Sequence, residues 1–357
     1  MRRRLTYAAA VCAISGLVLT ACGEAPDEED EQARGDYRAC MVTDVGGIDD
    51  RSFNESAWAG LLAAANERPD LFAEPVNVSS AAEADYVPNL TGFVEQGCDF
   101  ILAVGGLMAE ATAEVAAANP EQQFGIVDAK LDLDNVYPMQ FDTAQAAFLA
   151  GYLAAAYSTT GTVATYGGVN IPPVTIFMDG FVDGVAHYNE VRDADVQVLG
   201  WDKESQTGSF TDDFEDQAAG RSLSNSFVSQ RADVIMPVAG GAGLGTAAAA
   251  ADSDGEYTVI WVDVDGCESV PQYCSVFLTS VVKNIPDAVR TAVLEAATGT
   301  GLATGEFLGT LNNRGVSLAP FHEFEDELGP ELITDLIELE ADIADGTIQV
   351  SSPAQPR

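Results

Sequence analysis

The sequence predicts an α/β protein with two lobes, each built on a doubly wound parallel sheet. Apolar segments of strand length alternate with alanine-rich helical segments along the 357 residues. Continuous apolar strands with helices between them indicate parallel sheets that are covered on both faces. The segment 38–357 is too long for a single hydrophobic core, so two lobes are expected.

Strands are expected at the short apolar runs 39–43, 76–79, 100–104, 123–127, 162–166, 196–199, 234–238, 258–262 and 275–279. Helices are expected between them, at 56–66, 109–118, 144–157, 179–189, 243–251 and 287–297. In this architecture ligands bind at the carboxyl ends of the strands, where loops and helix N-termini present backbone N–H groups. The residues directly after each strand are therefore the candidate site residues.

The N-terminus has the layout of a secretory signal. Arginines at positions 2–4 precede an apolar stretch at 7–19, and Leu-Thr-Ala-Cys follows at 19–22. This ending matches the bacterial lipobox, in which the cysteine is acylated and becomes the mature N-terminus. We expect residues 1–22 to be a lipoprotein signal peptide and Cys22 to carry the lipid. The alternative is an ordinary signal peptide or a short membrane anchor.

Composition limits the partners of the mature chain. Residues 23–37 are acidic and polar, as in a disordered tether. No later stretch of about 18 uncharged apolar residues appears, so the lipid is the only membrane attachment expected. The formal net charge of −40 argues against nucleic acid or anionic lipid as a partner, because both require a basic surface.

The cysteines beyond the signal are an even number in an oxidising compartment: Cys40, Cys98, Cys267 and Cys274. The first two lie at the starts of strands that should be neighbours, and the last two bracket one short loop. The expected disulfides are therefore Cys40–Cys98 and Cys267–Cys274. A zinc site is the alternative, but the sequence has no CxxC and only two histidines, so no metal is expected.

Polar residues and glycines follow four of the expected strands: Asp44, Asp128, Asp263 with Asp265, and the loop 239–245. Each carboxylate either N-caps the next helix or, with Lys283, binds a ligand rich in hydroxyl and N–H donors. The glycine loop resembles a dinucleotide fingerprint, but Gly245 comes one residue too early. It is either a tight turn into a helix or a surface that a sugar approaches closely.

Two phenylalanines, Phe53 and Phe210, lie in polar loops, where an aromatic ring either caps the core or stacks on a planar ligand. Signs of catalysis are weak, since the chain has neither GxSxG nor HExxH. His187 and His322 lack an obvious partner. A pair of carboxylates, as in glycosidases, is the remaining catalytic alternative. We expect a binding protein without a cofactor rather than an enzyme.

Taken in order, several motifs resemble the basic membrane protein lipoproteins, a family that includes the purine nucleoside receptors of bacterial ABC importers. The matching segments are 43–54 with Trp58 and Gly60, 148–151, 171–174, 179–181, 238–241, 262–265, 279–283 and 315–321. The resemblance implies the type I periplasmic binding protein fold, which has two Rossmann-like lobes and a three-segment hinge.

The resemblance also implies the lobe boundaries. The N-terminal lobe would comprise residues 38–142 plus 276–314, and the C-terminal lobe 143–275 plus 315–357. The chain would cross between them near Asp142, Ser275 and Gly315.

In the nucleoside-binding members, the residues that match Phe53 and Phe210 sandwich the base. Other positions in these members bind the base edges and the ribose hydroxyls. The residues that match them here are Asp44, Asn54, Asp128, Gly240, Asp263 and Lys283. Two alternatives remain open. A short insertion after Phe210 lets Phe214 compete for the stacking position, and Asp265 competes with Asp263.

The base preference is also open, because Gly266 stands where a glutamine is common and Ala242 where a threonine is common. The function implied is that of a lipid-anchored protein on the extracytoplasmic face of the cell membrane. It would capture a nucleoside, purine above all, for an ABC transporter permease. The alternative is a binding protein or signalling receptor for another small polar ligand, such as a sugar.

Overall fold

A computed structural model of the protein describes residues 34–253, 255–299 and 305–356. The expected signal peptide, Cys22 and residues 23–33 of the expected tether lie outside the described residues. Among the helices that the structure describes, none is long and apolar enough to cross a membrane.

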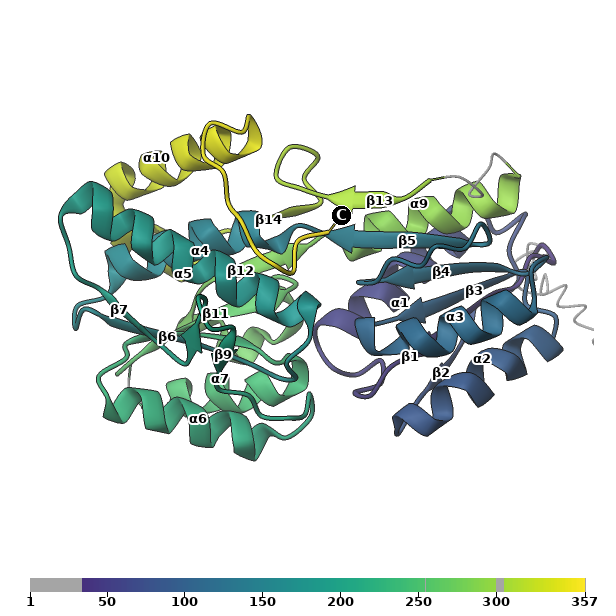
Figure 1. The fold of residues 1–357 in the computed structure, drawn as a ribbon, viewed down its shortest axis with the longest axis horizontal. Helices are drawn as coiled ribbons and strands as arrows, with labels where there is room; N and C mark the ends of the chain where they lie inside the picture. The colour runs from purple at the N-terminus through teal and green to yellow at the C-terminus, as the bar shows by residue number, and fades with distance from the viewer. Residues whose placement is uncertain (1–33, 254, 300–304, 357) are drawn as a thin grey trace, which may run out of the picture. The chain divides into compact units, whose positions relative to one another are not determined.

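Residues 34–357 form one compact unit that contains two six-stranded sheets (Figure 1). The first sheet is parallel throughout, in the order β13-β5-β4-β3-β1-β2. Its strands are β1 (Ala39–Thr43), β2 (Val76–Ser79), β3 (Phe100–Val104), β4 (Gln123–Val127), β5 (Val136–Phe141) and β13 (Phe307–Gly309). Its helices are α1 (Phe53–Glu67), α2 (Tyr86–Glu95), α3 (Ala109–Ala118) and α9 (Ile285–Thr298).

The second sheet has the order β14-β12-β11-β10-β6-β7, and only β14 is antiparallel to its neighbour. Its strands are β6 (Thr162–Gly167), β7 (Gln197–Leu199), β10 (Val234–Val238), β11 (Thr258–Asp263), β12 (Phe277–Lys283) and β14 (Val316–Leu318). Its helices are α4 (Thr143–Tyr157), α5 (Pro172–Arg192), α6 (Gln217–Ser229), α7 (Leu244–Asp252), α8 (Gly266–Ser269) and α10 (Glu325–Ala344). A small antiparallel ribbon joins β8 (Trp201–Asp202) to β9 (Thr207–Gly208).

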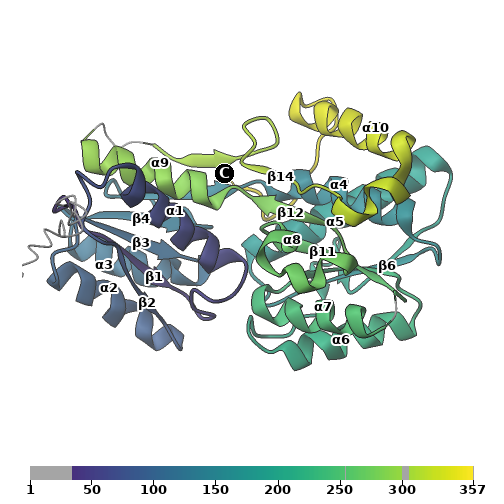
Figure 2. The same ribbon diagram turned by 180° about the vertical axis from the view of Figure 1, so that it is seen from behind.

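Both sheets are covered on both faces, as the continuous apolar strands predicted. In the first sheet, Met41 packs into the core under α1 and α9, while Val42 packs on the opposite face under α2 and α3. In the second sheet, α4 and α5 cover one face, and α6 and α7 cover the other (Figure 2). Each sheet with its helices is a Rossmann-like lobe, so the predicted two-lobed α/β fold is confirmed.

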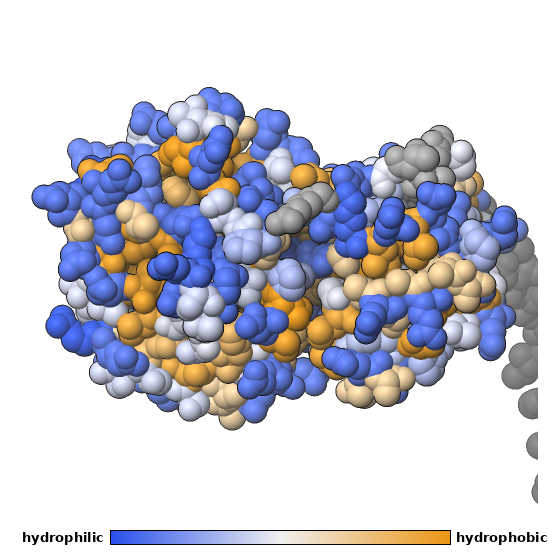
Figure 3. All heavy atoms as spheres, in the orientation of Figure 1, coloured by the Kyte–Doolittle hydropathy of each residue, from blue (hydrophilic) through white to orange (hydrophobic). Residues whose placement is uncertain are grey.

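The described surface mixes hydrophilic and hydrophobic residues on the face that Figure 3 shows. Its large exposed hydrophobic residues are Val76, Val191, Leu308 and Ile337. They lie on four different elements, β2, α5, β13 and α10, and single exposed apolar residues of this kind are normal for a folded domain.

Both expected disulfides are present. Cys40 and Cys98 join the starts of β1 and β3, which are neighbours in the first sheet. Cys267 and Cys274 close the short loop between β11 and β12. The first pair is almost fully buried, since Cys40 is 0% exposed and Cys98 is 3% exposed.

The expected lobe boundary at Ser275 is wrong by one strand. β12 pairs with β11 and β14, so it belongs to the second sheet. The chain returns to the first lobe only at Asn284, before α9. The apolar residues of β12 are buried on both faces because the strand lies inside the second sheet, between β11 and β14. The other two changes of sheet follow β5, at Asp142, and follow β13, at Gly315.

The three connections lie side by side and are joined by backbone hydrogen bonds. The N–H of Asp142 donates to the carbonyl of Gly309 at 2.8 Å, and the N–H of Asn284 donates to the carbonyl of Gly315 at 2.9 Å. The C-terminal segment adds a side-chain contact, since Gln355 Nε2 donates to both carboxylate oxygens of Asp142 at 3.2 and 3.1 Å.

Helices α4 and α5 pack with their backbones in contact because glycines line the crossing. A Cβ on Gly151 of α4 would lie 2.0 Å from the carbonyl oxygen of Phe181. On α5, a Cβ on Gly184 would lie 1.9 Å from the carbonyl oxygen of Phe148. Any side chain here would force the two helices apart.

Replacing Gly184 by alanine should therefore lower the free energy of unfolding by about 1–3 kcal/mol, measured by chemical denaturation. The matched control is Gly92→Ala in α2, where a Cβ would meet nothing closer than 3.9 Å. That change should be neutral or stabilise by up to about 1 kcal/mol, because alanine is the better helix former. Equal losses in the two variants would contradict this account of the packing.

Candidate functional site

A cavity lies between the carboxyl ends of the two sheets, where ligands bind in folds of this kind. It encloses about 590 Å³, including the part that is open to solvent. Residues from both lobes line it, in the loops after β1, β3, β4 and β10, at the ends of β11 and β12, and at the start of α5. The cavity brings together all but one of the predicted ligand-binding residues: Asp44, Phe53, Asn54, Asp128, Gly240, Asp263 and Lys283.

Lys283 lies at the end of β12 with 3% of its side chain exposed. Its Nζ donates to Asp128 Oδ2 at 2.6 Å and lies 3.4 Å from Asp263 Oδ1. Burial by itself would lower the pKa of Lys283, but the two carboxylates outweigh it, and the pKa lies above its ordinary value. Because Asp128 follows β4 of the first sheet, this ion pair joins the two lobes.

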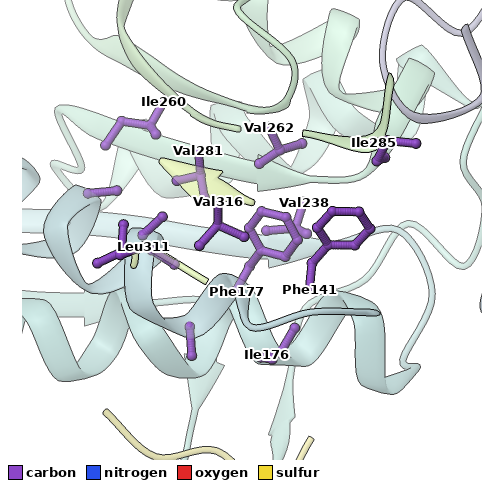
Figure 4. Packing of buried hydrophobic residues seen from close by; sticks show 14 of the residues in the cluster. Phe141, Ile176, Phe177, Val238, Ile260, Val262, Val281, Ile285, Leu311 and Val316 are labelled. Atoms are coloured by element: carbon purple, nitrogen blue, oxygen red, sulfur yellow. The ribbon is translucent and has the colours of Figure 1, made fainter. Parts of the chain in front are cut away.

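Aromatic rings surround the same ammonium group. Lys283 Nζ lies 4.9 Å from the ring centre of Phe53 and 5.1 Å from that of Phe177. The ring of Phe141 is farther, at 6.0 Å. Figure 4 shows the rings of Phe141 and Phe177 beside each other in the core under the site. A positive charge over the face of an aromatic ring is stabilised, so these rings help to stabilise the buried ammonium group of Lys283.

Asp263 is held from both lobes. Its Oδ2 accepts a hydrogen bond from Ser52 Oγ at 3.0 Å, and Ser52 comes from the loop before α1 in the first lobe. Both Asp263 and Asp128 have positive φ, at 70° and 64°. Non-glycine residues seldom adopt this conformation, and such strain is characteristic of functional sites.

Of the two alternatives Asp263 and Asp265, only Asp263 lines the cavity. The carboxylate of Asp265 is occupied elsewhere. Its Oδ1 accepts from the backbone N–H of Cys267 at 2.9 Å and so caps α8, and its Oδ2 lies 2.7 Å from His322 Nε2.

Asp44 and Asn54 form a pair at the other side of the cavity. Asn54 Nδ2 donates to Asp44 Oδ1 at 3.2 Å, and Asn54 Oδ1 is buried without a partner among the described residues. Burial raises the pKa of Asp44 to about 8; Asn54 opposes the shift, and the nearby charges of Asp50 and Asp128 add to it. The pair therefore offers a free acceptor beside a carboxyl group that titrates near neutral pH.

Asp50 and Phe177 are among the lining residues that the sequence reasoning missed. The carboxylate of Asp50 accepts the N–H groups of Asn54 at 2.7 Å and of Ser52 and Glu55 at 3.1 Å, as a cap on α1. Burial raises its pKa to about 6. An acidic residue just before a helix is a capping signal that could have found it. Phe177 lies in an apolar helical run, which gives no sign of a site.

Phe210 is the predicted residue that the structure does not bring to the cavity. Its ring packs edge-on against Trp201, at 6.0 Å between ring centres, and lies over Gly167. Phe214 lines the cavity in its place. The backbone carbonyl of Phe214 accepts the N–H of Ala242 at 2.8 Å, which ties its loop to the glycine turn after β10.

Comparison with known proteins identifies the family of the chain. A family model, Bmp, described as ABC transporter substrate-binding protein PnrA-like, matches residues 38–352. The chain belongs to the Bmp family. Bmp proteins are substrate-binding proteins of ABC transporters, so this chain is a solute-binding protein and not an enzyme.

Two curated relatives match the Bmp chain over nearly its whole length. A CD4+ T-cell-stimulating antigen of Listeria innocua is 33% identical over 100% of both chains. The ABC transporter nucleoside-binding protein BmpA of Lactococcus lactis is 28% identical over 99% of this chain and 100% of its own. A solute-binding protein of an ABC transporter system from Aeropyrum pernix has the same fold, with a TM-score of 0.78, 24% identity, and 90% and 94% of the two chains covered. The type I periplasmic binding protein fold is thereby confirmed.

The raised pKa of Asp44 makes the stability of this Bmp protein depend on pH. Between its ordinary pKa and about 8, the folded state holds a proton that the unfolded state has lost. Stability should therefore fall as the pH rises from about 5 to 8. Asp44→Asn should remove at least about 1.4 kcal/mol of this decline, which is what one pKa unit is worth. Thermal unfolding of the ligand-free protein at several pH values measures it, with the exposed Asp49→Asn as control. Parallel pH profiles for wild type and Asp44→Asn would refute the assignment.

Proposed function

We propose that this Bmp protein captures a nucleoside, purine above all, and delivers it to the permease of an ABC importer. The observation that carries the proposal is the composition of the cavity. Two aromatic side chains from opposite lobes, Phe53 and Phe214, line it together with a buried cluster of carboxylates around one lysine. A nucleoside has the matching parts, a planar base and a ribose with hydroxyl donors.

The aromatic residues would bind the base. Phe53 begins α1 in the first lobe, and Phe214 lies in the loop before α6 in the second. A planar ring between them would gain about 1 kcal/mol per stacked pair beyond its area burial. Asn54 and Asp44 would bind the edge of the base, since Asn54 Oδ1 is a buried acceptor that no described residue pairs with. A base with N–H donors on its edge would satisfy it.

The ribose would lie toward Lys283. Asp263 and Asp128 accept hydrogen bonds, and charged bonds of this kind are strong when they are buried. The lysine would donate to a hydroxyl oxygen. Because these groups come from both lobes, binding would hold the lobes together around the ligand, as in other hinged binding proteins.

The location is proposed from the N-terminus and from a relative. The lipobox at 19–22 supports a lipid anchor at Cys22 on the extracytoplasmic face of the cell membrane. The Lactococcus relative is named as a nucleoside-binding protein of an ABC transporter, which supports the same role here. Calorimetry with nucleosides, free bases and free sugars tests the ligand directly. Binding of a sugar with no binding of any nucleoside would overturn the assignment.

The stacking positions have a matched pair of variants. Phe53→Ala and Phe214→Ala should each weaken nucleoside binding by roughly 2–3 kcal/mol, through lost stacking and apolar burial, and should weaken free-base binding as well. Phe210→Ala removes a ring of the same type that does not line the cavity, so affinity should stay within a few-fold of wild type. Calorimetry on folded variants decides, and an equal loss for Phe210→Ala would show that its ring, not that of Phe214, contacts the base.

Asp263, the last residue of β11, and Asp265, the N-cap of α8, give a matched pair of variants that tests the ribose position. Asp263→Ala should weaken nucleoside binding by roughly 2–4 kcal/mol, because it leaves ribose hydroxyls or Lys283 unpaired in a closed site. It should spare the free base. Asp265→Ala, which lies outside the cavity, should leave both affinities close to wild type. Equal weakening of nucleoside and free base by Asp263→Ala would remove the ribose from this position.

The charge of the cavity predicts discrimination against nucleotides. Lys283 is already matched by two carboxylates, and Asp44 and Asp50 add further acidic groups to the lining. A phosphate would bring about two negative charges into this site without a free cation to pair with. A nucleoside 5′-monophosphate should therefore bind at least about 100-fold more weakly than its nucleoside, about 2.7 kcal/mol. Competition calorimetry measures the ratio, and comparable affinities would contradict the proposed ribose orientation.

A further inference from the structure

A second cluster of chemically active side chains lies outside the cavity, beside the loop between β11 and β12. Ligand atoms of Cys267, Cys274 and His322 all lie within 4.8 Å of one another. In the part of the chain that the structure describes, this is the one group of three or more His, Cys, Asp or Glu side chains with such spacing. Two sulfurs and an imidazole nitrogen are a donor set that Zn²⁺ prefers.

The histidine is fixed in place by a carboxylate. His322 Nε2 lies 2.7 Å from Asp265 Oδ2, and the other oxygen of Asp265 accepts the backbone N–H of Cys267 at 2.9 Å. One carboxylate thus orients both the imidazole ring and the start of the cysteine loop. A carboxylate on one ring nitrogen is the usual support of a metal-binding histidine, because it orients the ring and makes the other nitrogen more basic. His322 also has a positive φ of 46°, an uncommon conformation that the surrounding contacts maintain.

The two disulfides differ in access to solvent. Cys267 and Cys274 are half-buried, and 30% of the His322 side chain is exposed. Cys40 and Cys98 are 0% and 3% exposed. A reductant in solution must reach a sulfur atom before thiol–disulfide exchange begins, so it should attack the Cys267–Cys274 bond first.

We propose that the Cys267–Cys274 disulfide is a redox-controlled zinc site, closed to metal when oxidised and open when reduced. A dithiol reductant transfers two electrons and two protons: its own thiols become a disulfide, and Cys267 and Cys274 become thiols. Zn²⁺ then displaces the two thiol protons and binds both thiolates. In the zinc-bound form the two sulfurs lie roughly 3.8 Å apart, the edge of a tetrahedron with Zn–S bonds of about 2.3 Å.

In the metal-bound form, His322 supplies the third ligand through Nδ1 while Nε2 continues to donate to Asp265. Water takes the fourth position, since the site is open to solvent on the histidine side. This site is independent of the proposed nucleoside function, because Asp265, His322 and the two cysteines do not line the cavity.

The experiment compares the oxidised and the reduced protein. After mild treatment with a dithiol and anaerobic removal of the reductant, thiol titration should find two more free thiols than in the oxidised protein, those of Cys267 and Cys274. Zn²⁺ calorimetry should then show one tight site that the oxidised protein lacks. Co²⁺ in place of Zn²⁺ should give the absorption of a tetrahedral thiolate complex, which separates this site from weak binding at surface carboxylates. No gain in Zn²⁺ binding on reduction would overturn the proposal.

Variants locate the ligands. His322→Ala should weaken Zn²⁺ binding by the reduced protein at least 10-fold, and Asp265→Asn should weaken it by about 10–100-fold, as supporting carboxylates do elsewhere. His187→Gln is the control, because His187 packs against the rings of Phe148 and Tyr152, away from the cluster. Unchanged zinc affinity in folded His322→Ala would refute the histidine ligand. The comparison of oxidised and reduced wild-type protein uses no variant, so it tests the proposal even if a variant fails to fold.

Discussion

The buried ion pair between Lys283 and Asp128 is the interaction on which the site depends. The two residues end strands of different sheets, at 3% and 6% side-chain exposure, with 2.6 Å between nitrogen and oxygen. Removing two charges from water costs several kcal/mol per ion, and only close geometry with further hydrogen bonds offsets this. Asp263 and the rings of Phe53 and Phe177 provide that environment. The same ion pair therefore both joins the two lobes and sets the charge of the cavity.

The scaffold brings these residues to one place through close backbone packing. Glycines let α4 and α5 approach until their backbones touch, which fixes the layer beneath the second sheet. Beside them, the three connections between lobes are hydrogen-bonded to one another at Asp142 and Asn284. Gln355 binds Asp142, so the end of the chain reinforces the first connection.

Much of the fold and of the site was predictable from sequence, because local patterns carry the information. Continuous apolar runs with helices between them predicted covered parallel sheets, and the cysteine positions predicted both disulfides. Strand ends marked Asp44, Asp128 and Asp263 as site residues, since carboxyl ends of parallel strands converge. Strand β5 was not predicted; it contains Pro138, a residue that normally argues against an interior strand.

By itself, then, the sequence determined the two-lobed α/β class, the disulfide pairs, several of the residues that line the cavity and the family. Only the tertiary structure decided which of several similar side chains face the cavity. Phe210 and Phe214 lie in the same polar loop, and packing against Trp201 takes the first ring away from the site. Strand β12 joins the second sheet because its pairing partners are there. Such choices depend on contacts between residues far apart in the chain, and a local pattern carries no information about these.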